Sequence, residues 1–254
     1  MKKSLTAVTI LAAIAALATL GACSKSNDTA TPAAANATHA APPAANLADM
    51  ASPAAQKQLA EKALPKGDPA YPLASYRGVD SGNDLMFLFY GLSNLPVDYD
   101  KIAQSYSRDY QSTSDSFKKQ DLLSALKPRI DNAIASAKDS RYIVLTTPNA
   151  MLDAYDFNKK GFQLTNVAQP GSYQYFFDNS NYTIEYTNGP DYTFLKIGDE
   201  ATARSIEDMR SHFHPLTIRL YAYAQDADPA TNRVKLQIVH EQLLDSAGRV
   251  LVQS

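Results

Sequence analysis

The sequence predicts an α+β domain, in which a helical N-terminal half packs on a mainly antiparallel β-sheet from the C-terminal half. Apolar residues recur at helical spacing between residues 84 and 134, whereas β-branched and aromatic runs dominate after residue 141. All 15 Tyr and 9 Phe of the 254 residues lie at or after Tyr71, which indicates one aromatic core. Helices grouped before strands favour α+β over alternating βαβ units.

The first two expected helices lie on either side of the start of this aromatic region. A short helix is expected over residues 52–64, because Ser52 can cap it, Pro53 suits its first position and Pro65 ends it. Residues 84–92 are apolar on nearly all sides, which predicts a buried helix capped by residues 80–83.

Two more helices are expected before residue 141. One starts at Asp98 and keeps helical spacing at Tyr99, Ile102, Tyr106 and Tyr110. The other opens at Ser114 or Asp115. Pro128 removes a backbone donor and clashes with the preceding turn, so this helix is predicted to be kinked or split near Lys127.

The C-terminal half is predicted to be strands, interrupted by one helix over residues 200–210. The expected strands are 141–146, 152–157, 161–167, 173–177, 182–186, 192–197, 216–225, 234–243 and 249–252. Two hairpins are predicted, one joining 152–157 to 161–167 and one joining 173–177 to 182–186. The second pairing sets Phe177 beside Tyr182, Tyr175 beside Ile184 and Tyr173 beside Tyr186.

The N-terminus carries a motif with defined chemistry. A basic start precedes an uncharged run of small and apolar residues that ends in Leu20-Gly21-Ala22-Cys23. So short a run with these flanks is typical of a signal peptide rather than a membrane span. The motif resembles the lipobox of bacterial lipoproteins. The alternative is an ordinary secretory signal in which Cys23 has no role.

The lipobox resemblance implies that Cys23 carries a diacylglycerol on its sulfur and becomes the first residue after cleavage. Acyl chains such as palmitate would then anchor the protein, and two or more hold firmly because each buried CH₂ contributes about 0.8 kcal/mol. Ser24 rather than Asp after the cysteine implies the outer membrane, with the domain facing the periplasm.

The chain is expected to have three parts. Residues 1–22 are a signal peptide, residues 23–67 hold the lipidated Cys23, a disordered Ala/Pro-rich linker and the short helix, and residues 68–254 form a single α+β domain. A flexible linker of about 40 residues reaches roughly 35 Å, which would let the domain search for a partner.

Composition and motifs exclude several classes of function. The chain has 24 Lys and Arg against 26 Asp and Glu, without the clustered positive charge that nucleic acid needs. One cysteine excludes an internal disulfide and a Cys-rich zinc site. The sequence holds no G-x-S-x-G, Walker, G-x-G-x-x-G or H-E-x-x-H motif, so neither an enzyme activity nor a cofactor is predicted.

His212 and His214 are the best metal candidates. Two histidines one residue apart can point the same way from an extended segment, and a third ligand could be His240 or a carboxylate. Such a site would make the protein a metal-dependent envelope hydrolase. The alternative is a polar loop before Pro215, with His240 as a hydrogen-bonded core residue in phase with Val234, Leu236 and Ile238.

Residues 226–232 are acidic enough to resemble a calcium loop. They lack the Gly at the sixth position and the terminal Glu that such a loop uses. A hairpin connection rich in Asp, Pro and Asn explains the same composition. No metal is therefore predicted.

One predicted hairpin supplies the candidate ligand face. Strand alternation places together Tyr173, Tyr175, Phe177, Tyr182 and Tyr186. An exposed face of this kind could stack on sugar rings or receive a protein partner. The alternative, which the sequence favours, is that helices of the first half cover these residues and make them core.

The C-terminal segments allow one further comparison. Residues 215–226, with residues 232–235 and 248–250, are similar to an uncharacterised domain family of bacterial envelope proteins. That resemblance implies neither an activity nor site residues. The sequence as a whole predicts an envelope lipoprotein whose domain binds or scaffolds an unknown envelope protein or glycan without catalysis, the alternatives being the hydrolase and a glycan-binding module.

Overall fold

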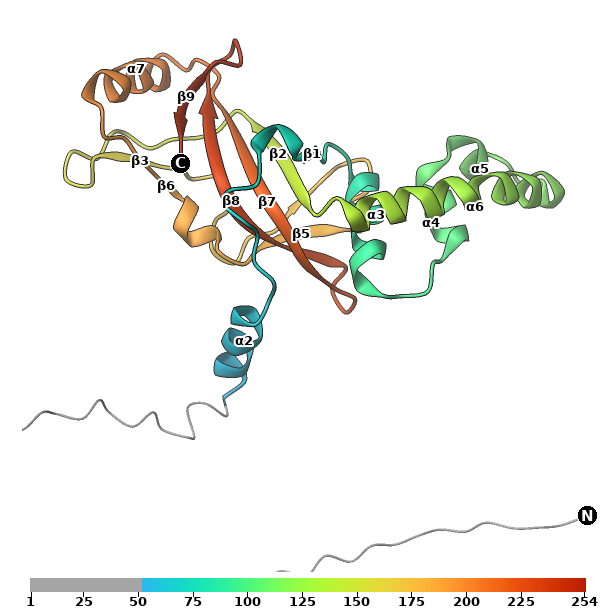
Figure 1. Cartoon of the computed structure of the whole chain (residues 1–254). Helices are drawn as coiled ribbons and strands as arrows, with labels where there is room; N and C mark the ends of the chain where they lie inside the picture. The colour runs from blue at the N-terminus through green and yellow to red at the C-terminus, as the bar shows by residue number, and fades with distance from the viewer. Residues whose placement is uncertain (1–51) are drawn as a thin grey trace, which may run out of the picture. The chain divides into compact units, whose positions relative to one another are not determined.

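The computed structural model describes residues 52–254, in which a group of helices precedes a mixed β-sheet (Figure 1). The predicted α+β class, with helices first and strands after, is confirmed. The signal peptide, the lipobox with Cys23, and the Ala/Pro-rich residues 24–51 lie outside the described residues. Within residues 52–254, no helix is both long and apolar enough to cross a membrane.

The first two helices lie close to their predicted positions, and the second begins two residues earlier than expected. Helix α2 spans Pro53–Lys62 and follows Ser52. Helix α3 spans Gly82–Ser93, and the Ser81 side chain caps it by accepting a hydrogen bond from the Asp84 backbone. Its apolar residues are buried around nearly the whole helix, as expected for a central core helix.

The next two predicted helices differ from expectation. Residues 99–112 form two helices, α4 (Tyr99–Tyr106) and α5 (Arg108–Ser112), because the Ser107 side chain accepts from the Tyr110 backbone and starts a new helix. Helix α6 (Ser116–Asp139) is not split but continues through Pro128. Pro128 is exposed, so the backbone carbonyl that loses its donor can turn to solvent.

The main sheet has the strand order β1-β2-β7-β8-β5-β4, and β9 also pairs with β8. Most neighbouring strands are antiparallel, whereas the β1–β2 and β5–β8 pairs are parallel. The bounds are β1 Arg77–Gly78, β2 Tyr142–Pro148, β4 Gln174–Tyr175, β5 Thr183–Tyr186, β7 Thr217–Asp228, β8 Arg233–Leu244 and β9 Val250–Gln253.

A separate two-stranded sheet corrects two predictions. Strand β3 (Gly161–Gln163) pairs with β6 (Phe194–Lys196), so residues 192–197 do not continue the main sheet. The predicted hairpin partner, residues 152–157, makes only two isolated bridges to residues 161 and 164. The strands approach closely at Gly161, where an added Cβ would lie 2.1 Å from the Leu195 carbonyl oxygen. Helix α7 (Glu200–Ser211) follows β6.

The long hairpin β7–β8 carries two hydrophobic clusters on one face. Helices α3, α4, α5 and α6 gather at one end of this hairpin, and α7 with the small sheet lies at the other (Figure 1). The first cluster includes Leu85, Phe89, Ile130, Ile184 and Leu236. The second includes Phe162, Leu195, Ile206, Leu220 and Ile238.

A β-bulge at Val239 changes which side chains of β8 face the core. Ala222 pairs with Ile238, whereas the adjacent Tyr221 pairs with His240, so β8 holds one extra residue. The prediction that His240 shares the face of Ile238 is therefore wrong. Beyond the bulge, Glu241 pairs with Leu220 and takes its place on the core face.

The opposite face of the sheet is crossed by residues 65–69, here called the strap. The Pro65 carbonyl accepts from Gln225 at 2.8 Å, and the Gly67 amide donates to Gln237 at 2.9 Å. His240 Nε2 lies 2.9 Å from the Pro69 carbonyl oxygen. The tyrosines beside the strap pack on one another: Tyr71, Tyr76, Tyr142, Tyr221 and Tyr223.

Candidate functional site

The hairpin β4–β5 carries the aromatic residues that the sequence singles out, but in a different register. Gln174 pairs with Ile184 and Tyr175 with Thr183, whereas the predicted pairing set Tyr175 beside Ile184. Because side chains alternate along a strand, a slip of one residue moves each side chain of one strand to the other face. The predicted register is therefore wrong, and the five-residue aromatic face divides into an outer and an inner group.

The inner group belongs to the core. Tyr182 is 1% exposed and its ring packs on Phe89 and Tyr90. Tyr186 is half-buried between the two hydrophobic clusters, and its hydroxyl donates to Gln174 Oε1 at 2.8 Å. For these two residues the core interpretation applies.

The outer group is open to solvent. Tyr173, Tyr175 and Phe177 are 54%, 44% and 94% exposed and are spaced two residues apart. Strand β4 covers only Gln174–Tyr175, so the predicted strand 173–177 is shorter than expected and Tyr173 and Phe177 flank it. The rings of Tyr175 and Phe177 meet edge to face at 5.6 Å, and the Arg233 guanidinium lies 5.2 Å from the Tyr173 ring centre. Three neighbouring exposed rings form a larger apolar surface than a single exposed side chain, so segment 173–177 is a candidate binding surface.

A pocket of about 480 Å³, here called the aromatic groove, lies beside these rings. No residue that lines it is ionised at neutral pH. Its lining consists of Thr147, Thr165, Asn166, Ala168, Gln169, Ser172, Tyr173, Gln174, Tyr175, Phe177 and Tyr186.

Constrained backbone on two sides holds the groove in shape. Ala168 adopts a left-handed conformation with φ 51°. Its carbonyl oxygen lies so close to Gly189 that a Cβ added at Gly189 would be 2.6 Å from that oxygen. On the other side, the Asp178 carboxylate accepts from the Gly82 amide at 2.8 Å and so fixes the hairpin tip to the start of α3. The groove is thus preformed by the fold.

The polar groups of the groove are hydroxyls and amides. Thr147 Oγ1 is buried and has no hydrogen-bond partner among the residues that the structure describes. Burial raises the pKa of Tyr186, so its hydroxyl stays neutral at physiological pH. Aromatic faces beside neutral donors and acceptors suit a polyhydroxylated, uncharged ligand.

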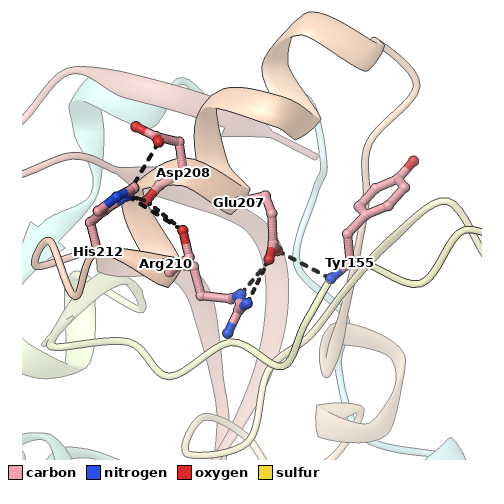
Figure 2. Close-up of polar contacts among 6 residues, drawn as sticks. Tyr155, Glu207, Asp208, Arg210 and His212 are labelled. Atoms are coloured by element: carbon pink, nitrogen blue, oxygen red, sulfur yellow. Dashed lines mark hydrogen bonds and ion pairs between the residues drawn. The ribbon is translucent and has the colours of Figure 1, made fainter.

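The structure gives the histidine pair a different setting from the one the metal hypothesis needs. His212 ends helix α7 and Phe213 has φ 58°, so the segment is a turn rather than an extended strand. His212 lies beside Asp208 (Figure 2), with 3.2 Å between His212 Nδ1 and Asp208 Oδ1. The imidazole centres of His212 and His214 are 6.4 Å apart. Across residues 52–254, no group of three His, Cys, Asp or Glu side chains is placed to hold a metal.

The polar cluster next to His212 ties a loop to helix α7. Glu207 forms a two-contact ion pair with Arg210, which lowers the pKa of the Glu207 carboxyl (Figure 2). The same carboxylate accepts from the Tyr155 amide at 3.2 Å. Glu207 and Arg210 are thus paired with each other, and Glu207 also attaches the loop at Tyr155 to helix α7.

The acidic segment 226–232 forms the tip of the β7–β8 hairpin. The Asp228 carboxylate accepts from the Ala230 amide at 2.9 Å and from the Thr231 hydroxyl at 2.7 Å. The Thr231 hydrogen bond is the main reason why the pKa of Asp228 is lowered. These contacts are those of a turn.

Sequence reasoning missed one buried carboxyl group. Glu241 is 4% exposed and lies on the wall of a pocket of about 430 Å³ near β9, here called the Glu241 pocket. Burial raises the pKa of its carboxyl to about 7, and a side-chain hydrogen bond with Ser254 offsets part of that effect. In the sequence, Glu241 is visible as a single acidic residue near the end of the apolar strand 234–243. Its burial could not be predicted, because only the β-bulge places its side chain on the core face.

Comparisons with protein-family models, with curated proteins and with solved structures find no match for this chain. The site is therefore interpreted from its own geometry and chemistry.

Proposed function

We propose that this protein is a lipid-anchored lipoprotein of the bacterial envelope whose domain binds a neutral glycan, without catalysis, in the aromatic groove. The observation that carries the proposal is the row Tyr173, Tyr175 and Phe177, exposed beside a pocket whose lining holds no ionised residue. Apolar faces of sugar rings pack on aromatic rings, while their hydroxyls need neutral donors and acceptors.

The lining supports a glycan over a charged ligand. Phosphate or carboxylate groups would need a cation inside the groove, whereas no lining residue is a Lys or Arg, and Arg233 lies over the ring of the lining residue Tyr173. The hydroxyls and amides of the lining are neutral donors and acceptors, which favours a ligand with many hydroxyls and no net charge.

Binding should depend on the outermost ring. Phe177→Ala is expected to weaken binding of a neutral oligosaccharide roughly tenfold or more, because about 1.5–3 kcal/mol accompanies burial of a Phe side chain. The measurement is isothermal titration of the full-length chain with tetrasaccharides of glucose and of N-acetylglucosamine. Phe117→Ala removes an equally exposed ring from helix α6 and should leave the affinity unchanged.

Two results would contradict the glycan proposal. One is the absence of binding by every tetrasaccharide at millimolar concentration. The other is equal weakening by Phe177→Ala and by Phe117→Ala, which would show that the groove is not the binding surface.

The membrane anchor is tested separately at Cys23. In cells fed labelled palmitate, the wild-type chain is expected to carry label and to sediment with membranes, because its acyl chains are buried in the bilayer. Cys23→Ser should lose the label and move to the soluble fraction. Equal membrane association of the two proteins would count against lipid anchoring and would leave the groove experiment unaffected.

A further inference from the structure

A second pocket, here called the α7 pocket, is formed by residues of helix α7 and of the loop that precedes β3. Its volume of about 580 Å³ exceeds that of the aromatic groove and falls within the range of small-molecule sites, roughly 300–1,000 Å³. The two pockets share no lining residue. The α7 pocket is therefore a separate site.

Much of the lining of the α7 pocket is apolar. Ile197 and Ala203 are buried, whereas Phe157 is 82% exposed. The ring of Tyr155, which also lines the pocket, meets Phe157 edge to face at 5.1 Å and the fully buried Phe162 at 5.2 Å. Three rings thus lead from the core to the pocket. Buried aliphatic groups beside an exposed ring favour an alkyl chain as the occupant.

Backbone contacts fix the loop residues at the pocket. The Lys160 carbonyl accepts from the Ile197 amide at 2.9 Å, which joins the end of the loop to the segment after β6. Glu207 accepts from the Tyr155 amide, and the Tyr155 ring extends away from that contact (Figure 2). A Cβ added at Gly198 would meet no atom within 4 Å beyond its chain neighbours, so the pocket is open there.

The charges of the lining leave one lysine without an ionic partner. Glu200 pairs with Arg204 at 2.6 Å, and Glu207 pairs with Arg210 at 2.5 Å. Lys160 is exposed and forms no ion pair within residues 52–254. Because each acid of the lining is neutralised by an arginine, the Lys160 ammonium favours an anionic group on the ligand.

We propose that the α7 pocket binds an anionic amphiphile, which is a molecule with one alkyl chain and a carboxylate or phosphate head. The chain packs against Phe157 and Ala203, and the head lies at the Lys160 ammonium. A lysine is a compact charge on a flexible stem, so it can bind either kind of head. This proposal does not depend on the glycan proposal, because the two sites have no residue in common.

The experiment is isothermal titration of the full-length chain with octanoate. Octanoate is expected to bind at least tenfold more tightly than butanoate, because each buried methylene group strengthens binding about fourfold. It should also bind about two- to fivefold more tightly than n-octanol, which is the effect of one exposed ion pair. The cation n-octylammonium should bind more weakly than n-octanol.

Phe157→Ala tests the position of the alkyl chain. This variant should weaken octanoate binding about fivefold or more, because it removes apolar surface that the chain would cover. Phe117→Ala removes a ring that is 86% exposed on helix α6 and should leave the affinity unchanged. Equal effects of the two variants would overturn the proposal.

Lys160→Asn tests the position of the head. Lys160 has φ 57°, a conformation that asparagine tolerates well. The variant should bind octanoate no more tightly than n-octanol while keeping the affinity of the wild-type chain for n-octanol. Lys159→Asn is the matched control, because the neighbouring Lys159 lies over the Phe194 ring outside the lining. A lysine with a purely structural role would change the affinity for both ligands alike.

The kind of head is distinguished by n-octyl phosphate. Binding at least as tight as that of octanoate would assign the pocket to phosphate-headed lipids, whereas weaker binding would assign it to fatty acids; either result supports the anionic amphiphile. The proposal would be overturned by any of three results: no binding of octanoate at millimolar concentration, equal affinity for butanoate and octanoate, or tighter binding of n-octylammonium than of octanoate.

Discussion

Glu241→Gln is expected to remove most of the pH dependence of folding stability between pH 4.5 and pH 7. The pKa of Glu241 is raised from 4.5 to about 7 in the folded protein. Between these values the native state keeps a proton that the unfolded state has lost, so the free energy of unfolding falls as pH rises and levels off above pH 7. The shift corresponds to about 3 kcal/mol of pH-dependent stability. A glutamine has no ionisable group and so adds no such dependence.

Urea unfolding at pH 4.5, 5.5, 7 and 8.5 measures this difference. The wild-type midpoint should decline from pH 4.5 to pH 7 and change little between pH 7 and pH 8.5, and the Glu241→Gln midpoint should stay comparatively level. Glu200→Gln is the matched control, because Glu200 is an exposed carboxylate of helix α7 that forms a surface ion pair with Arg204. A wild-type midpoint that does not change with pH would show that Glu241 is not desolvated.

Tyr182→Ala is expected to cost about 3–5 kcal/mol of folding stability, the usual price of removing a large ring from a packed core. Tyr182 is 1% exposed and contacts the rings of Phe89 and Tyr90. Phe177→Ala should change stability by no more than about 0.5 kcal/mol, since Phe177 is 94% exposed.

The pair of variants tests the strand register directly. In the register predicted from sequence, Phe177 and Tyr182 lie side by side on one face and would behave alike. In the observed register they lie in different environments, and their costs should differ severalfold. Equal costs in thermal and urea unfolding would contradict the observed pairing of Tyr175 with Thr183.

Local patterns were sufficient for the elements that fold around their own residues. Helix α3 is apolar on nearly all sides and has a serine cap, and the strands β7 and β8 are long segments in which apolar and polar residues largely alternate, so each could be placed closely from sequence. The break at Ser107 also has a local cause, because a serine followed by Asp109 in the first turn is an N-terminal signal.

Non-local pairing explains the failures. Strand β5 is held in parallel against β8, and its Ile184 aligns with Val234, so its register is set by a strand far along the chain rather than by its own hairpin turn. The Val239 bulge likewise has no marker in the sequence, which holds neither Gly nor Pro there. Without it, Glu241 would be assigned to the outer face.

Only the part of the candidate site that lies on one continuous segment could be predicted from the sequence. Alternation identifies Tyr173, Tyr175 and Phe177 as neighbours, since the sequence predicts one strand over residues 173–177. Thr147 and Gln169 come from other segments, and only the assembled fold brings them to the groove. The Glu241 pocket needs three segments in addition to the bulge, so no single motif could have revealed it.

The strap determines where mechanical load would enter the domain. A pull on the chain before Pro65 would first strain the hydrogen bonds from residues 65–69 to Gln225, Gln237 and His240. These three side chains sit on the two longest strands, so tension would be shared by the most extensively bonded hairpin of the sheet. Tension along residues 65–69 would therefore load the β7–β8 hairpin before the hairpin β4–β5, which joins it only through the pairing of β5 with β8.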